Sequence, residues 1–247
     1  MGFYERLVIH QRLETETSRF IYFKDALLSE RYDANVLAYK KMPSLMEIQS
    51  DIAFVRQAQK DYPSDYVQID FPENATLPRL LDDYVTQEGF ERSTYLIFWA
   101  TSEDLVLSSK KVEGVSVHRL DEELFERYYH YIYPSLEAYG QVYAQQMFKY
   151  KKGFIENPQA SIFLALKDES IVGEITAWYH GDSVEFDEFE VVKELRGQGI
   201  GSLLEKAAMT KSVSNVILIA EEENRHLYQH QGFKEVGHYQ HIFKKYD

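Results

Sequence analysis

A glycine-punctuated loop between Val191 and Leu204 has the composition of an anion-binding site. Gly197, Gly199 and Gly201 lack a Cβ atom, so the backbone can turn sharply there and its N–H groups can converge on one point. The loop leads into an amphipathic helix pattern, and a helix N-terminus favours negative charge. The spacing therefore predicts a pyrophosphate site. The GxGxxG spacing of dinucleotide sites is absent, and no Lys-Ser/Thr pair follows as in a P-loop.

The segment before this loop carries four acidic residues, Glu185, Asp187, Glu188 and Glu190. A carboxylate whose pKa is raised by burial or by neighbouring charges suits general base catalysis. The same residues could instead form the solvated face of a strand, and the pattern leaves both readings open.

The apolar alternation of residues 184–191 slips by one position between Phe186 and Phe189. A slip of one residue in a half-buried strand predicts a β-bulge.

The elements that must position these residues follow one another regularly from about Val115. Hydrophobic periodicity and turn residues predict a mixed α/β fold with one long sheet. We expect strands at 115–119, 161–166, 171–179, 184–192 and 216–220, helices within 120–150 and at 199–212 and 224–231, and a closing hairpin of 233–236 and 239–244 through Gly237.

The first 112 residues show helical periodicity at 44–60 and an apolar run at 95–100. The order strand 66–71, helix 78–87 and Gly89-Phe90 parallels strand 216–220, helix 224–231 and Gly232-Phe233. This similarity indicates either a degenerate half-repeat or a chance recurrence. A polar stretch at 108–114 predicts a boundary that separates residues 1–112 from residues 113–247.

Composition excludes several classes of protein. The net charge of -13 repels phosphate backbones, so no nucleic-acid partner is expected. The densest basic cluster, Lys149, Lys151 and Lys152, is interpreted as a solvated helix end. The absence of cysteine excludes disulfides and thiolate metal sites and favours a cytoplasmic protein. No stretch approaches the roughly 18 apolar residues of a membrane span, so no membrane partner is expected.

The loop resembles the signature of the GNAT superfamily, the Gcn5-related N-acetyltransferases, which reads Gln/Arg-x-x-Gly-x-Gly/Ala at a strand-to-helix junction. Arg196, Gly199 and Gly201 occupy its three fixed positions. The resemblance covers roughly residues 115–247 and implies a GNAT-like acyl-CoA N-acyltransferase fold with an additional N-terminal α/β region. It also implies acetyl-CoA as cosubstrate, no metal, and a slot for the pantetheine arm between two strands splayed by the bulge.

The resemblance also suggests residue roles. For cofactor binding it implies the backbone of Val191 and Val192, the loop residues Arg196, Gly197, Gln198, Gly199, Ile200 and Gly201, and Asn224, for which helix capping is an equal explanation. Glu185 matches the glutamate base of histone-type members, and Glu188 beside the bulge is the second candidate. Tyr228 matches a tyrosine that protonates the coenzyme A sulfur.

These observations predict an N-acetyltransferase in which a primary amine of a small-molecule or peptide acceptor attacks acetyl-CoA directly. The alternative is a non-catalytic acyl-CoA-binding sensor or protein-interaction module, and either protein could be a monomer or a homodimer. Six tyrosines in residues 128–143 either line the acceptor site or pack on the sheet. His226 and His230 have a metal-binding spacing, but helix-face histidines explain them better because no third ligand is evident.

Overall fold

The computed structural model describes residues 11–110, 112–209 and 212–246. The chain forms two compact units, the first from residues 1–97 with 236–247 and the second from residues 98–235. The division falls within the strands β5 (Glu91–Thr101) and β11 (Lys234–Lys245). The boundary expected from the sequence, between residues 112 and 113, lies further along the chain, in the segment that follows β5.

The second unit holds the predicted loop. Four of its strands each pair antiparallel with the next one along the chain: β6 (Val115–Arg119), β7 (Ala160–Lys167), β8 (Ser170–His180) and β9 (Ser183–Val191). The strand β10 (Asn215–Glu221) pairs parallel with β9. The strand order is β5-β10-β9-β8-β7-β6, so β5 is the other neighbour of β10. The helices are α4 (Glu122–Glu137), α5 (Gln141–Lys152), α6 (Ile200–Ala208) and α7 (Arg225–His230). The mixed α/β fold expected from the sequence is confirmed.

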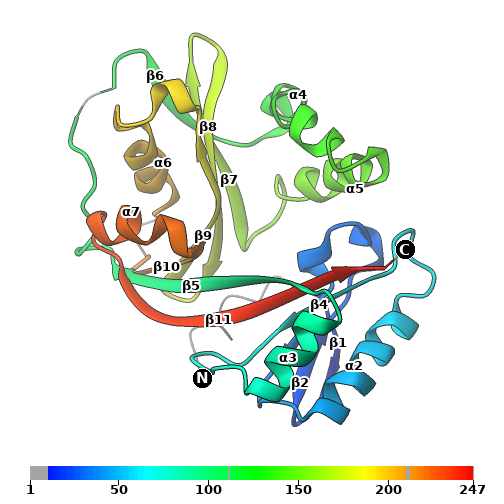
Figure 1. Ribbon diagram of the computed structural model, residues 1–247. Coiled ribbons are helices and arrows are strands. Elements are labelled where there is room, and N and C mark those ends of the chain that lie inside the picture. Colours follow the sequence, from blue (N-terminus) through cyan, green and yellow to red (C-terminus); the bar gives the residue numbers. More distant parts are fainter. Residues whose placement is uncertain (1–10, 111, 210–211, 247) are drawn as a thin grey trace. The chain divides into compact units, whose positions relative to one another are not determined.

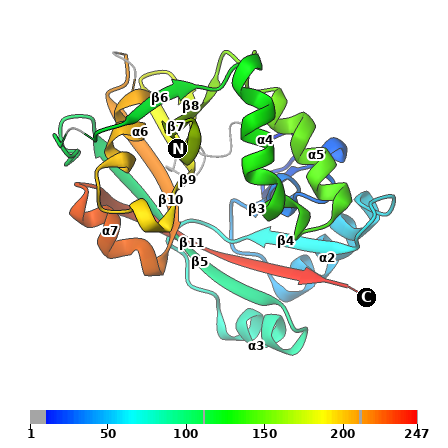
Figure 2. The same cartoon turned by 90° about the horizontal axis from the view of Figure 1, so that it is seen from above.

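The helices of this unit cover both faces of its sheet. The pair α4 and α5 lies on one face, and α6 and α7 lie on the opposite face (Figures 1 and 2). Side chains at alternate positions of β7, including Ile162 and Leu164, pack with Phe125 and Tyr128 of α4. This alternation follows from the period of two in a strand, which gives every second side chain to the same face.

The first unit contains β1 (Leu13–Glu16), β2 (Phe20–Phe23), β3 (Leu37–Tyr39), β4 (Tyr66–Asp70) and most of β11, paired in that order. Its helices are α2 (Leu45–Ala58) and α3 (Arg79–Gln87), whose residues Ile48, Ile52 and Leu81 enter one core with strand residues such as Val67 and Ile69. Among the helices of the described residues, none is long and apolar enough to cross a membrane.

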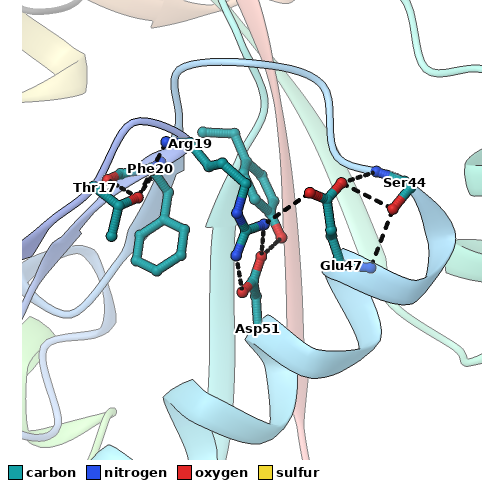
Figure 3. A network of polar contacts seen from close by, with 7 residues as sticks. Thr17, Arg19, Phe20, Ser44, Glu47 and Asp51 are labelled. Atoms are coloured by element: carbon teal, nitrogen blue, oxygen red, sulfur yellow. Dashed lines mark hydrogen bonds and ion pairs between the residues drawn. The ribbon is translucent and has the colours of Figure 1, made fainter.

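A polar network fixes the start of α2 in this unit (Figure 3). Ser44 and Glu47 form a capping box, in which the Glu47 N–H donates to the Ser44 hydroxyl and the Ser44 N–H donates to the Glu47 carboxylate at 2.7 Å. Arg19 donates two hydrogen bonds of 2.8 and 2.9 Å to the buried Asp51 carboxylate, which also accepts from the Tyr39 hydroxyl at 2.8 Å. These bonds tie Tyr39 of β3 and Arg19 of the turn between β1 and β2 to α2.

Ser44→Ala should lower the free energy of unfolding by about 1 kcal/mol, because it removes the N-cap acceptor of α2. Chemical denaturation followed by circular dichroism measures the change, with Ser109→Ala at an exposed loop serine as the control. Equal unfolding free energies for the two variants would show that the box adds no stability.

The strand–helix–Gly-Phe order noted in the sequence occurs in both units. The N–H of Phe90 donates to the carbonyl of Val85 at 3.1 Å, and the N–H of Phe233 donates to the carbonyl of Tyr228 at 3.0 Å. Gly89 and Gly232 both have positive φ, at 73° and 93°. Both helices thus end in the same glycine-dependent turn, which supports the half-repeat interpretation.

The predicted closing hairpin is wrong. Residues 234–245 form one continuous strand, β11, and Gly237 lies within it. A Cβ at Gly237 would lie 2.6 Å from Oε1 of Glu73, so this glycine permits close approach of a neighbouring loop. Sequence reasoning mistook this packing requirement for a turn.

Candidate active site

The loop before α6 has the geometry of an anion cradle. Gly197 and Gly199 adopt φ values of 74° and 95°, which side chains with a Cβ rarely accept. The first helical bond runs from the N–H of Leu203 to the carbonyl of Gly199 at 3.2 Å. Within the described parts of the chain, no acceptor is found for the N–H groups of residues 197–202. Such a set of unsatisfied donors at a helix N-terminus suits a phosphate or pyrophosphate.

A cavity of about 600 Å³ opens at this loop. It is lined by Ser108, Phe189, Glu190, Val191, Leu195, Arg196, Gly197, Gly199, Ile200, Gly201, Ser202, Asn224, Leu227, Tyr228, His230 and Gln231. The lining therefore joins the end of β9, the loop, the start of α6 and the helix α7.

The predicted β-bulge is confirmed in β9. Glu174 of β8 lies opposite Glu190, whereas Thr176, two residues further along, lies opposite Asp187, so β9 contains one extra residue between these pairs. Glu188 occupies the bulge with φ of 46°, a left-handed conformation that costs on the order of 1 kcal/mol or more for a residue with a side chain.

Strands β9 and β10 separate beside the bulge. Their parallel pairing runs from Ser183 with Asn215 to Phe186 with Leu218 and then stops, although β9 continues to Val191. The last residues of β9 therefore have an edge that β10 does not pair. This is the splayed pair of strands that the sequence analysis expected.

A second cavity, of about 570 Å³, lies beside the same bulge. It is lined by Tyr128, Tyr131, Ile132, Ser135, Leu136, Tyr143, Met147, Lys151, Glu174, Glu188, Phe189, Glu190 and Arg196. Phe189, Glu190 and Arg196 line both cavities. The two cavities are thus adjacent, one formed by α4, α5 and the sheet and the other by the loop and α7.

Buried polar groups connect helices and strands in the second cavity. The Tyr128 hydroxyl donates to Oε2 of Glu174 at 2.7 Å. Oε2 of Glu188 accepts from the ammonium group of Lys151 and, at 2.9 Å, from the hydroxyl of Thr176. The prediction that Lys151 belongs to a solvated helix end is wrong, because its side chain is only 4% exposed and pairs with Glu188.

Burial in this cluster changes its acid–base properties. Desolvation raises the pKa of Glu174 to about 7, opposed by the charge of Lys151 and the hydrogen bond from Tyr128 and assisted by the charges of Glu188 and Glu190. Desolvation and the charges of Glu174 and Glu188 raise the pKa of Tyr128 well above its ordinary value. Tyr128 therefore stays a hydrogen-bond donor at neutral pH, while Glu174 can change its protonation state there.

The structure brings most of the predicted site residues together. The first cavity is lined by Val191, Arg196, Gly197, Gly199, Ile200, Gly201, Asn224 and Tyr228, and the second by Glu188 and Arg196. Three predicted residues line neither cavity. The Val192 N–H donates to the carbonyl of Val172 at 2.9 Å. The side-chain amide of Gln198 donates to the carbonyl of Glu194 at 3.4 Å. Glu185 lies within the paired part of β9, where burial raises its pKa.

Asn224 and Tyr228 lie on the α7 side of the first cavity. Asn224 is the N-cap residue of α7, but its side chain makes no capping hydrogen bond, so capping does not explain its presence. The Tyr228 ring packs against Phe98 and Phe233 at centroid distances of 5.4 and 5.8 Å. Burial raises the pKa of Tyr228, with a smaller contribution from Glu205, so the phenol remains protonated at neutral pH.

Sequence reasoning missed Glu174 and the role of Lys151. A signal for Glu174 was present, because it is the one charged residue in the mainly apolar strand segment 171–179. A buried strand accepts a charged side chain only where a partner or a function compensates for it. Of the tyrosines in α4 and α5, Tyr128, Tyr131 and Tyr143 line the second cavity, whereas Tyr129 and Tyr133 pack in the core around Phe125. Some tyrosines of that run thus line a cavity, and others pack in the core.

Within the described residues, no group of three or more histidine and acidic side chains could hold a metal ion.

Residues 158–235 match the family model described as an acetyltransferase (GNAT) domain, and residues 3–98 match a domain of unknown function (DUF5613). A search of curated proteins finds no match to this sequence.

Several solved structures share this architecture. A functionally unknown conserved protein from Staphylococcus epidermidis ATCC 12228 is 22% identical, with 100% of this chain and 98% of that chain covered and a TM-score of 0.87. A GCN5-related N-acetyltransferase from Kribbella flavida is 12% identical, with 99% and 96% covered and a TM-score of 0.67. A tandem GNAT protein from the clavulanic acid biosynthesis pathway is 13% identical, with 93% and 81% covered and a TM-score of 0.56.

At these identities the structural likeness shows the fold alone, and the family model adds the membership of the C-terminal segment. Residues 158–235 therefore belong to the GNAT acetyltransferase domain family, within a chain whose fold is GNAT-like and carries an additional N-terminal region.

Proposed function

We propose that this protein is an N-acetyltransferase that transfers the acetyl group of acetyl-CoA to a primary amine by direct attack. The observation that carries the proposal is the meeting of two cavities at the bulge of β9. One cavity contains the anion cradle, and the other contains the titratable cluster around Glu174. A thioester held at the bulge would thus be accessible to an acceptor from the other side.

The residues of the first cavity fit acetyl-CoA. The N–H groups of residues 197–202, for which the described residues offer no acceptor, match the pyrophosphate, and the part of β9 that continues beyond its pairing with β10 matches the amide groups of the pantetheine arm. Gly201 keeps the helix start close to Phe189, since a Cβ there would lie 3.0 Å from the ring. When bound, acetyl-CoA supplies an activated acetyl group on a thiol leaving group.

The second cavity fits a small amine or the amine-bearing end of a peptide. Its volume of about 570 Å³ lies in the range of small-molecule sites. Its tyrosines offer apolar walls with polar tips. Its glutamates, of which Glu188 is fixed by Lys151, favour a cationic amine.

A free-thiol assay with a panel of amines, corrected for hydrolysis, tests this function. We expect thiol release that depends on the amine, and mass spectrometry should identify the N-acetylated product. Calorimetric binding of acetyl-CoA without amine-dependent release would favour the alternative, a non-catalytic acyl-CoA sensor. A protein that neither binds acetyl-CoA nor releases thiol would contradict both the acetyltransferase proposal and the sensor alternative.

Tyr228 is proposed to donate the proton to the departing thiolate, because its half-buried phenol lines the cofactor cavity and stays protonated at neutral pH. Tyr228→Phe should therefore lower kcat by at least about tenfold while leaving the Kd for acetyl-CoA within about twofold.

Tyr179→Phe is the matched control for this variant. It removes a hydroxyl that donates to the carbonyl of Ala208 at 2.8 Å, away from both cavities. Steady-state kinetics and calorimetry on both variants provide the measurement. A kcat for Tyr228→Phe equal to that of Tyr179→Phe would remove the assigned role.

A further inference from the structure

Glu174 is a carboxyl group placed at considerable cost in the middle of an apolar strand. It is 8% exposed, and it lies in β8 between Gly173 and Ile175. Its Oε2 accepts the hydroxyl of the fully buried Tyr128, and its side chain lines the acceptor cavity next to the bulge. Since burial of a carboxyl group opposes folding, its position calls for a chemical use.

We propose that Glu174, oriented by Tyr128, is the base that takes the proton from the acceptor amine, in a reaction that rests on the function proposed above. This assignment differs from both carboxylates suggested by the sequence pattern, which lie on β9. Glu174 comes from the neighbouring strand β8, opposite Glu190 in the register of the two strands.

Glu188 is less suited to take the proton because its carboxylate is already engaged. One oxygen accepts from both the Lys151 ammonium and the Thr176 hydroxyl. An oxygen that already accepts from an ammonium group and a hydroxyl group is less accessible to a substrate amine. Glu188 is therefore a positioning residue: it holds Lys151 in place, and its left-handed backbone forms the bulge.

The surroundings of Glu174 give it a basicity suited to proton transfer near neutral pH. The ionisable groups that face it are Tyr128 and Tyr131 from α4, Lys151 from α5, and Glu188 and Glu190 from β9. Burial raises its pKa to about 7, with Lys151 and Tyr128 opposing and the two glutamates assisting. A base whose pKa lies near the working pH is half ionised there and still accepts a proton strongly.

The step balances without a further reactant. An acceptor that arrives as an ammonium ion first loses one proton to solvent. The neutral amine nitrogen then forms a bond to the acetyl carbon, and the carbon–sulfur bond breaks. One proton passes from the nitrogen to Glu174, and one passes from Tyr228 to the sulfur. Glu174 then releases its proton to solvent and Tyr228 regains one, so that both residues return to their starting states.

Glu174→Gln tests the inference, because glutamine keeps the shape and can still accept from Tyr128 but is not basic. We expect kcat/KM for the amine to fall about 100-fold or more. The Kd for acetyl-CoA should stay unchanged. In the wild type, kcat/KM should rise with pH through about 7, as Glu174 becomes ionised. This limb of the pH profile should be absent from Glu174→Gln.

Tyr128→Phe provides a second variant in which Glu174 is retained. Loss of the hydroxyl removes a hydrogen bond that lowers the pKa of Glu174, so the rising limb should move to higher pH. Tyr179→Phe, which loses a hydroxyl of a half-buried residue away from both cavities, should keep the wild-type profile.

The outcomes separate this inference from the function on which it rests. If Glu174→Gln keeps the kcat/KM and the rising limb of the wild type, the role of Glu174 is overturned while the acetyltransferase proposal stays intact. A wild-type protein that releases no thiol with any amine would overturn both. If the rising limb of Tyr128→Phe lies at the wild-type pH, Tyr128 does not tune the basicity of Glu174.

Discussion

Gly201→Val is expected to abolish measurable binding of acetyl-CoA and, with it, any transfer. A Cβ at position 201 would lie 3.0 Å from Cζ and 3.7 Å from Cε2 of Phe189, so a branched side chain would force the ring or the start of α6 to move. Phe189 lines both cavities at the bulge, and the N–H groups of α6 form part of the cradle. Calorimetry should give a Kd at least about 100-fold higher, a loss of roughly 2.7 kcal/mol.

Two further glycine variants serve as a matched pair for this result. Gly197 and Gly114 have almost the same φ, 74° and 71°, and a Cβ at either position would meet nothing within 4 Å. Alanine at either site should therefore cost the same stability, about 1–2 kcal/mol. Only Gly197→Ala, which lies in the cradle, should also weaken acetyl-CoA binding. Equal affinities in Gly114→Ala, Gly197→Ala and Gly201→Val would show that the loop does not hold the cofactor.

The features that sequence reasoning predicted correctly have local causes. Gly197 and Gly199 adopt the left-handed backbone that only glycine accepts readily, and this requirement is visible in their residue type. The bulge at Glu188 is encoded by the phase of its neighbours, because Phe186 and Phe189 cannot face the same side of an unbroken strand. Such signals need no knowledge of what lies elsewhere in the chain.

The features that could not be predicted from the sequence depend on contacts between residues far apart in the chain. Lys151 belongs to a basic helix end in the sequence, and only the fold places Glu188, 37 residues later, against it. Gly237 is explained by the approach of Glu73 and not by a turn. Glu174 gains its importance from Tyr128 on another element. Pattern reasoning over short windows cannot recover such pairs, since they are determined by packing.

Glu205 provides a prediction about stability. It is a fully buried residue of α6, and neither of its carboxyl oxygens has a hydrogen-bond partner among the described residues. Desolvation by burial raises its pKa to about 7 in the folded protein, from 4.5 for an exposed group. Below pH 4.5 the group is protonated in both states and costs nothing by ionisation.

As the pH rises from 4.5 to about 7, the unfolded chain ionises at this residue while the folded protein stays protonated. The unfolded state then binds fewer protons, so the free energy of unfolding falls with pH and levels off above 7. Glu205→Gln removes this dependence. At pH 8 it should be more stable than the wild type by on the order of 3 kcal/mol, and at pH 4.5 the two should be about equal.

Denaturant unfolding at several pH values measures this difference, and the contribution of Glu174 cancels because both proteins contain it. Glu126→Gln, at an exposed position of α4, controls for the loss of a negative charge from a protein of net charge -13. Only the gain in stability that Glu205→Gln shows beyond this control is assigned to the buried position. A Glu205→Gln curve parallel to that of the wild type from pH 4.5 to 8 would mean that Glu205 is paired or hydrated in solution.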